Sequence, residues 1–470
     1  MLSACFIRMK ELKRNRLFQI GLISFLLYSW ISYLSKYFIY GVGYENRPII
    51  LFLLLYLILF LFYFLAIHLV LRSNEQNKDL KIVLLFAVLF RLVLLPSNPI
   101  QEDDHYRYLW DGKVTRNGIN PYKYSPDEIR EFEENREKVE YTYEKIKELE
   151  SLNLIRFENY QSEILFDRVN HPDVPTIYPP FSQIVFSFAD VFFSGGITGL
   201  RMILFLFDLA VLWMVLLLLK SQKINPLYSV IYAWSPLVIK EIVNSLHMES
   251  IPLLFLTLST YLLIKSCPRM SIFTYSLSIL SKYYSLMLLP IFFAVIRKDG
   301  WLKLFTTAII LLFTLLIFCF PFIDNGWSMF EGLIIYGSRW ERNDSIFAVI
   351  KYLTGNHQMA IIIVFCVFTV ILGYITLADG DIVKKILILL TAFILLSPTQ
   401  YPWYFISLLP FLTFYPNRAL LLLSGLLSLY YLEFYFIYHQ FNQAILLIPW
   451  FEYLPFYILL MYDMFIKCEK

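Results

Sequence analysis

Charged residues are scarce in this chain. They make up 16% of its 470 residues, whereas hydrophobic residues make up 58%, and the mean hydropathy is +0.60. So apolar a composition excludes an ordinary soluble globular domain and indicates an integral membrane protein. The net charge is only +3, and no basic tract is interleaved with aromatic residues, so nucleic acid is not an expected partner.

Cysteine is scarce as well, with five residues in the whole chain. Cys319 and Cys366 fall inside apolar runs, and Cys5, Cys267 and Cys468 fall in segments expected on the cytoplasmic side. None lies in a predicted outer loop, and no spacing is typical of a metal site. The sequence therefore predicts no disulfide framework.

The polar–apolar alternation of a membrane β-strand is also absent. Long apolar runs occur instead, and residues 48–71, 198–219, 302–322 and 358–378 are each long enough for a helix to cross about 30 Å of hydrocarbon. We therefore predict an all-α fold, a polytopic transmembrane helical bundle of about 12 to 14 spans. Further spans are expected over residues 17–40, 80–97, 226–243, 249–265, 384–397, 402–415, 418–438 and 444–466, with a short pair inside 271–296.

Lysine and arginine residues orient this bundle. The N-terminus is basic, and the apolar run 17–40 behind it is too long for a signal-peptide core, so we expect a retained first helix with a cytoplasmic start. Residues 98–180 then form an outer loop, and residues 181–193 a juxtamembrane or re-entrant helix. The basic residues of the later connectors all fall on the cytoplasmic side: Lys220, Lys223, Lys265, Arg269, Arg297, Lys298, Lys384, Lys385 and Arg418.

One stretch of the outer loop has a plain structural interpretation. From Asp127 to Leu152, apolar residues recur at helical spacing among Glu, Arg and Lys. This pattern predicts an amphipathic helix that lies along the membrane or the protein surface, and Pro126 is a suitable start for it.

Three consecutive acids, Glu102, Asp103 and Asp104, differ from the rest of the loop because they directly follow a predicted span. Crowded carboxylates raise one another's pKa, so any of them could act as a general base or hold a divalent cation. The alternative is a plain helix N-cap with solvated neighbours.

The surrounding motifs carry a resemblance. The acids are followed by YRYLWDG at residues 106–112, GINPY at 118–122 and HPDVPTIYPP at 171–180. This set resembles bacterial members of the GT-C superfamily of integral-membrane glycosyltransferases, most closely those that are mannosyltransferase-like and use a polyprenyl-phosphate sugar. Weaker matches continue the resemblance over residues 80–415: NSLHMES at 244–250, SKYYSLMLLP at 281–290, RWERNDSIF at 339–347 and SPTQYPWYFISLLP at 397–410.

The resemblance implies transfer of a hexose, with mannose favoured, from a polyprenyl-phosphate donor to a hydroxyl of a glycan or lipid-linked acceptor. Asp103 or Asp104 would be the base, and Glu102 and Asp111 would be supports or metal ligands. Mg²⁺ or Mn²⁺ is a conceivable cofactor, held by Asp103 and Asp104. Arginine and lysine favour phosphoryl oxygens, so the expected donor-phosphate ligands are Arg107, Lys282, Arg339 and Arg342. The expected substrate-binding residues are His105, Tyr106, Trp110, Asp111, Asn120, Tyr122, Tyr178, His247, Tyr401, Trp403 and Tyr404.

Under this interpretation the chain has five segments. N-terminal transmembrane helices cover residues 1–97, and an outer catalytic loop with juxtamembrane helices covers 98–197. A transmembrane bundle over 198–322 and an outer loop over 323–357 precede the C-terminal transmembrane helices of 358–470. The expected location is a membrane, amid its lipids, and the cytoplasmic membrane if the protein is bacterial, with the active site on the outer face.

Two other classes stay open. An O-antigen-type polymerase or ligase also acts on lipid-linked glycans at the outer face, but it is expected to use arginine and histidine in a late loop. A polytopic transporter is expected to hold its polar residues near the midplane, between repeats that this sequence does not show. The acidic motif in the first outer loop favours the glycosyltransferase.

Overall fold

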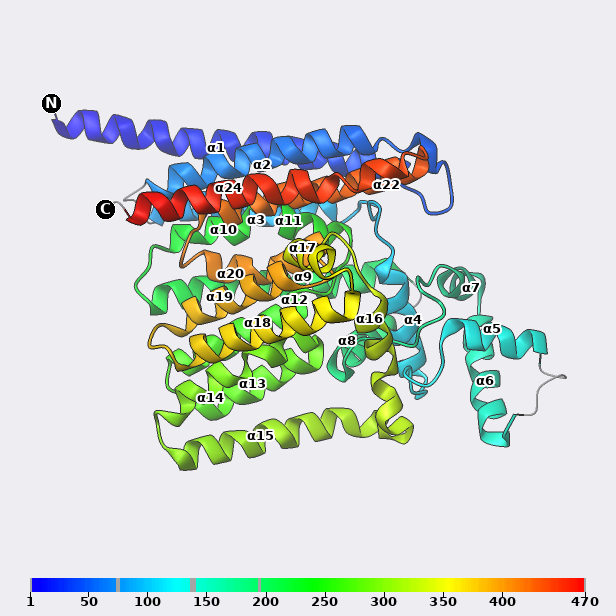
Figure 1. Ribbon diagram of the computed structural model, residues 1–470. Coiled ribbons are helices and arrows are strands. Elements are labelled where there is room, and N and C mark those ends of the chain that lie inside the picture. The colour runs from blue at the N-terminus through cyan, green and yellow to red at the C-terminus, as the bar shows by residue number, and fades with distance from the viewer. Residues whose placement is uncertain (1, 73–76, 136–140, 193–195, 469–470) are drawn as a thin grey trace. The chain divides into compact units, whose positions relative to one another are not determined.

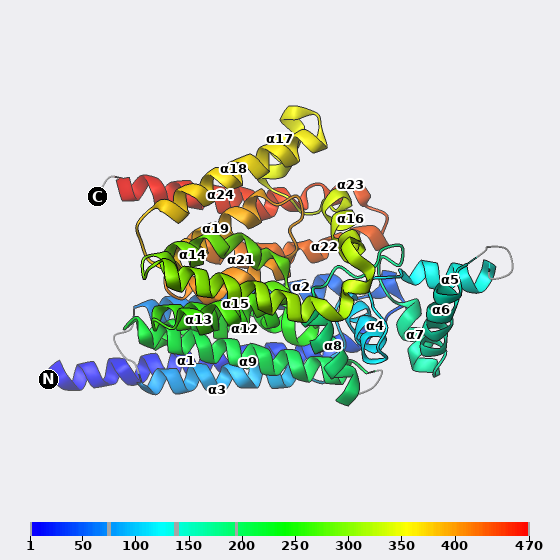
Figure 2. The ribbon, with the colours of Figure 1, turned by 90° about the horizontal axis from the view of Figure 1, so that it is seen from below.

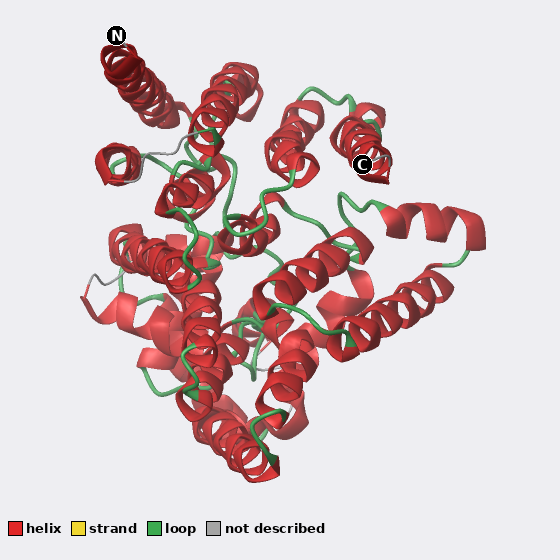
Figure 3. Cartoon of the chain, turned by 90° about the vertical axis from the view of Figure 1, so that its left-hand side faces the viewer, coloured by secondary structure: helices red, strands yellow, loops and turns green. Residues whose placement is uncertain are grey.

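The computed structural model describes residues 2–72, 77–135, 141–192 and 196–468. Within these ranges the regular elements are all helical and no strand occurs, as Figure 3 shows. An isolated β-bridge joins Arg342 to Thr399. The all-α class predicted from the sequence is therefore confirmed.

Seven helices of the described chain are long and apolar enough to cross a membrane, which agrees with a multi-pass membrane protein. They cover Asn15–Tyr37, Ile49–Leu71, Ile197–Ser221, Trp301–Asp324, His357–Leu377, Arg418–Tyr438 and Asn442–Phe465. Shorter apolar helices cover Pro180–Phe192, Ser250–Ile264, Tyr283–Arg297 and Pro402–Leu412. The predicted total of about 12 to 14 spans counts shorter helices as well and stays a prediction.

The contacts divide the chain into two compact units, each made of segments that are far apart in sequence. Unit 1 consists of Met1–Gln101, Leu209–Asn244 and Glu341–Lys470, and unit 2 of Glu102–Asp208 and Ser245–Trp340. Helix α9 (Ile197–Ser221) begins in unit 2 and ends in unit 1.

Unit 1 contains three N-terminal helices, a broken central segment and the C-terminal helices. In Figure 2, α1 and α3 lie side by side, and they are in contact. The helices of this unit are α1 (Leu2–Leu34), α2 (Ile49–Leu71), α3 (Asn77–Leu94), α10 (Val230–Ala233), α11 (Pro236–Val238), α17 (Ile346–Thr354), α18 (His357–Leu377), α19 (Ile382–Leu396), α20 (Leu409–Leu412), α21 (Arg418–Leu426), α22 (Leu432–Tyr438), α23 (Asn442–Ile445) and α24 (Ile448–Cys468).

Residues 226–243, predicted as one span, do not form one continuous helix. The segment is a series of short helical pieces that ends in a π-helix, Ile239–Asn244. Pro236 has no backbone N–H to donate and interrupts the helix. Carbonyls freed by the break accept hydrogen bonds from buried side chains: Tyr63 donates to Ile231 O at 2.6 Å, and Arg91 donates to Ala233 O at 2.7 Å. These bonds satisfy backbone groups that would otherwise be buried without partners.

Unit 2 surrounds the predicted acidic motif. Its helices pack in the pairs α4 with α8, α12 with α13, and α13 with α15, and Figure 1 shows α4 and α8 next to each other. The helices of this unit, apart from the first part of α9, are α4 (Asp104–Arg116), α5 (Pro126–Asn135), α6 (Tyr143–Arg156), α7 (Tyr160–Asp167), α8 (Pro180–Phe192), α12 (Ser250–Ile264), α13 (Pro268–Ser281), α14 (Leu289–Arg297), α15 (Trp301–Cys319) and α16 (Glu331–Arg339).

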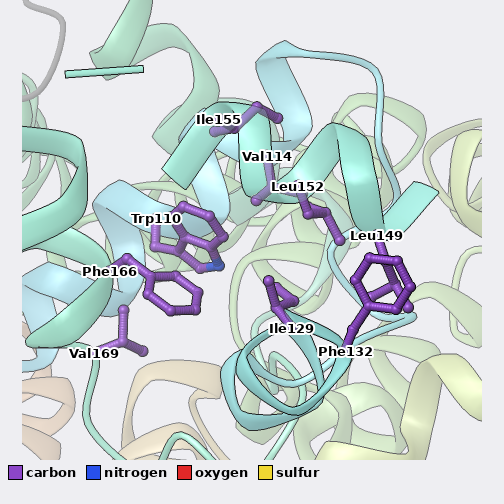
Figure 4. Packing of buried hydrophobic residues seen from close by; sticks show 9 residues of the cluster. All are labelled: Trp110, Val114, Ile129, Phe132, Leu149, Leu152, Ile155, Phe166 and Val169. Carbon is purple, nitrogen blue, oxygen red and sulfur yellow. The ribbon is translucent and has the colours of Figure 1, made fainter. Parts of the chain in front are cut away.

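The amphipathic helix predicted from Asp127 to Leu152 is instead a pair of packed helices, α5 and α6, with residues 136–140 outside the described part. The predicted start at Pro126 is confirmed. The apolar residues share one cluster with α4 and α7, because folding back buries more apolar surface than one continuous helix could. Figure 4 shows its members: Trp110, Val114, Ile129, Phe132, Leu149, Leu152, Ile155, Phe166 and Val169.

Candidate functional site

The three acids meet at the start of α4. Asp103 occupies the N-cap position, but its side chain makes no capping hydrogen bond. Asp104 is the first residue of the helix, where the N-terminal end of the helix dipole stabilises a negative charge. The carboxylate of Asp103 is therefore available for contacts outside the helix.

Asn170 joins two of these carboxylates. Its side-chain amide nitrogen lies 3.1 Å from Asp103 Oδ1 and 2.6 Å from Asp104 Oδ1 and donates to both. Sequence reasoning missed Asn170, although it directly precedes the HPDVPTIYPP motif.

Arg107 holds the backbone beside Asn170. Its Nη2 donates to the carbonyl oxygens of Asn170 at 2.8 Å and His171 at 2.7 Å. The Arg107 side chain is buried, so the contacts that place it are with the protein's own carbonyls. Its predicted role as a donor-phosphate ligand stays a prediction.

His247 lies close to two of the three acids, and its predicted role in substrate binding stays a prediction. Its Nδ1 lies 3.6 Å from Asp104 Oδ2, and its Nε2 lies 3.8 Å from Glu102 Oε2. The hydroxyl of Tyr108 donates to Asp104 Oδ2 over 3.4 Å. The segment before α12 thus approaches the N-terminus of α4, and Asp104 gains partners on two sides.

Lys282 forms an ion pair with Glu249. The lysine follows α13 and retains 21% of its side-chain exposure, whereas Glu249 retains only 2%. The charge of Lys282 also reaches Asp104, where it favours the ionised carboxylate. Sequence reasoning had left Glu249 without a role, and the sequence offers no local signal for this pairing.

The environments of the two aspartates separate their titrations. Burial and the like charge of Asp104 raise the pKa of Asp103 to about 6. Burial would also raise the pKa of Asp104, but interactions with His247, Asn170 and Lys282 outweigh it and lower the pKa to about 2. Asp104 is therefore ionised at neutral pH. The pKa of Asp103 instead lies close to neutral pH, where a general base is most effective.

The residues next on α4 are engaged inside unit 2. Burial lowers the pKa of His105 to about 3, so its imidazole is neutral, and its ring centroid lies 4.2 Å from that of Tyr106. The Tyr106 hydroxyl accepts a hydrogen bond from Arg168 at 2.9 Å. Trp110 is buried in the apolar cluster, where its ring meets Phe166 at 4.7 Å.

Asp111 is buried against the segment that leads into α8. Thr176 donates a hydrogen bond to its Oδ2, and Gln183 Nε2 lies 3.5 Å from the same oxygen. Burial raises the pKa of Asp111 to about 6. The carboxyl group therefore connects α4 to the HPDVPTIYPP segment at residues 171–180 and to the start of α8, and the sequence did not predict this contact.

Asn120 and Tyr122 of the GINPY motif also make internal contacts. Asn120 Nδ2 donates to Phe322 O at 3.1 Å, and its Oδ1 accepts from the backbone N–H of Tyr122 at 3.0 Å. The Tyr122 hydroxyl donates to Tyr178 O at 2.6 Å. The Tyr178 ring packs edge-on against that of Tyr108 at 4.9 Å. The two motifs assigned to substrate binding are thus joined to each other.

The ion-pair partner of Arg339 is Asp173, at 3.2 Å, and not one of the three acids before α4. Both side chains of this pair are exposed. Trp340 packs edge-on against His171, with ring centroids 4.7 Å apart. The end of α16 is therefore joined to the loop that carries Asn170.

The remaining predicted residues belong to unit 1. Arg342 pairs with Glu433, and its backbone N–H donates to Pro398 O at 3.0 Å. Tyr401 and Trp403 are stacked with ring centroids 4.5 Å apart and planes within 3°, and Tyr404 meets Tyr401 edge-on. One face of Tyr401 is therefore covered by Trp403.

In the described part of the chain, no group of three or more His, Cys, Asp or Glu residues is arranged to hold a metal ion. Asp103 and Asp104, the predicted cation ligands, instead share the amide of Asn170. Their use by a divalent cation stays a prediction.

No protein-family model matches this chain. A search of curated proteins also finds no significant match.

Proposed function

We propose that the protein is a GT-C type glycosyltransferase that moves a hexose from a polyprenyl-phosphate donor to an acceptor hydroxyl at the outer face of the membrane. The resemblance of its motifs favours mannose as this hexose. The observation that carries this proposal is the pair of carboxylates at the start of α4. One titrates near neutral pH and the other stays ionised, which is the arrangement that a general base and its electrostatic support require.

Asp103 is the better candidate for the base. Its Oδ1 accepts from Asn170, and its Oδ2 makes no hydrogen bond to another described residue. In the proposed step, Oδ2 takes the proton of the acceptor hydroxyl while that oxygen bonds to the anomeric carbon. The bond from the anomeric carbon to the phosphate oxygen breaks, and the polyprenyl phosphate leaves with the electron pair.

Lys282 is the best-placed cation for the donor phosphate. It is partly exposed, and its charge reaches Asp104. An ammonium group stabilises negative charge as it develops on the leaving phosphate. If Mg²⁺ or Mn²⁺ takes part, Asp103 and Asp104 would hold it and the ion would stabilise the same phosphate charge.

An O-antigen-type polymerase or ligase and a transporter remain the alternative proposals. What supports the glycosyltransferase over these two is that the acids, His247 and Lys282 gather in unit 2 around α4, whereas Arg342 is paired with Glu433 within unit 1.

The test is transfer by the purified protein from a panel of polyprenyl-phosphate hexoses, with and without a chelator. The wild type should transfer at least one sugar, and Asp103→Asn should lose transfer by about 100-fold or more while keeping its folded state. Asp104→Asn should also be impaired. The panel also includes nucleotide sugars, and dependence on these alone would overturn the class.

Asp299→Asn is the matched control, because Asp299 forms an exposed ion pair with Lys303 between α14 and α15. This variant should keep wild-type transfer. Full activity in both Asp103→Asn and Asp104→Asn would remove the proposed mechanism.

A further inference from the structure

Asn170 is placed to control how the two aspartates face the substrate. Its amide nitrogen carries two hydrogens, and two acceptors lie within hydrogen-bonding distance, Asp103 Oδ1 at 3.1 Å and Asp104 Oδ1 at 2.6 Å. We infer that Asn170 is a positioning residue that holds both carboxylates by one oxygen each and leaves Asp103 Oδ2 turned towards the acceptor hydroxyl. This inference rests on the proposed glycosyl transfer.

A neutral double donor suits this position. Two carboxylates that lie side by side repel each other, and without a shared donor they would turn apart. A lysine or arginine at residue 170 would hold them too, but its positive charge would weaken Asp103 as a base. The amide of Asn170 fixes both oxygens without adding charge.

Arg107 in turn fixes Asn170. It lies one helical turn after Asp104 on α4, so both residues project from the same face of the helix. Its guanidinium holds the carbonyl oxygens of Asn170 and His171, and His171 has a left-handed backbone with φ of 46°. A non-glycine residue is costly in that region, and the two hydrogen bonds stabilise the turn. Arg107 therefore acts on the carboxylates through Asn170.

Other ionisable groups lie near the aspartates, namely Glu102, His247 and Lys282. His247 acts electrostatically on both aspartates and Lys282 on Asp104, whereas Asn170 donates a hydrogen bond to an oxygen of each aspartate. Loss of Asn170 should therefore free both carboxylates to rotate, and it should also raise the pKa of each because the hydrogen bonds from Asn170 favour the ionised form.

The experiment measures kcat and KM for the donor in Asn170→Ala, Asn170→Ser and Asn170→Asp. In Asn170→Ala the carboxylates lose their fixed orientation, so kcat should fall about 10- to 100-fold while the KM stays unchanged. A small misplacement of a reacting group is enough to lower the rate of the chemical step. Asn170→Ser, which keeps one donor, should recover part of kcat. Asn170→Asp, which removes both donors and adds a negative charge, should be the least active.

Asn159→Ala is the structural control. Asn159 caps α7 through the backbone N–H of Ser162, so its loss should lower the melting temperature without changing kcat. If Asn170→Ala lowers only the melting temperature, as this control does, or leaves kcat unchanged, the inference fails.

A double-mutant cycle tests the link to Arg107. If Arg107 acts through Asn170, Arg107→Gln and Asn170→Ala should each lower kcat, and the double variant should be little worse than either single one. If Arg107 binds the donor phosphate instead, Arg107→Gln should raise the donor KM and add to the effect of Asn170→Ala. A wild type that transfers no sugar would refute the proposed function, whereas an active wild type with an insensitive Asn170 would refute only this inference.

Discussion

Gly112 of α4 lies directly against the backbone of Phe186 in α8. A Cβ atom at residue 112 would come within 2.5 Å of both the carbonyl carbon and the carbonyl oxygen of Phe186. The two helices can pack this closely only because glycine has no side chain. Since α4 carries Asp103 and Asp104 at its start, this contact helps to place the carboxylates.

Gly112→Ala should therefore destabilise the protein by about 1–3 kcal/mol, because the backbone of α8 has to move away. Thermal unfolding in detergent measures the effect as a lower melting temperature. Gly337→Ala in α16, where a new Cβ would have no neighbour within 4 Å, should unfold like the wild type. Equal melting temperatures for the two variants would contradict the close contact.

The rate of transfer should depend on pH through Asp103. Its pKa is raised to about 6, so the carboxylate is ionised above that pH and protonated below it. A protonated Asp103 cannot accept the proton of the acceptor, so kcat/KM should be constant above about pH 7 and fall about tenfold per pH unit below about pH 6. Stopped assays between pH 4.5 and 8 measure this profile. A flat profile down to pH 5 would show that another group is the base.

Substitution of Lys282 should affect stability and donor binding separately. Lys282→Met leaves the buried carboxylate of Glu249 without its ion-pair partner, which should cost about 3–5 kcal/mol. The double variant Lys282→Met with Glu249→Gln should recover most of this stability because it removes the unpaired charge. If Lys282 binds the donor phosphate, the double variant should still show a donor KM raised by about 10- to 100-fold. A wild-type KM in the folded double variant would exclude that role.

Tyr122 should prove to be a structural link between two motifs. Its hydroxyl donates to Tyr178 O at 2.6 Å, and Tyr122→Phe removes this hydrogen bond while keeping the ring. The expected loss is about 1 kcal/mol of stability, measured by thermal unfolding, with little change in kcat. Tyr143→Phe on α6 is the comparison, since the Tyr143 side chain is 82% exposed and should not matter. A large loss of kcat in a stable Tyr122→Phe variant would instead support the direct role in substrate binding.

Much of the helical layout could be predicted because long apolar runs and helical spacing are local properties of a chain. The predicted span over residues 48–71 is α2, Ile49–Leu71, and the predicted start at Pro126 is that of α5. The two departures from the predicted helices have different causes. Pro236 breaks the segment at 226–243 locally, whereas α5 and α6 are separate helices because their apolar faces pack into one cluster.

The sequence by itself determined the all-α class, the membrane character and the crowding of Glu102, Asp103 and Asp104 after an apolar run. Only the tertiary structure decided which groups meet those acids. Asn170 is 66 residues from Asp104, and Lys282 is 33 residues from Glu249. Pairings at such separations depend on how α4 packs with the segments around it, and no periodicity or spacing in the sequence encodes them.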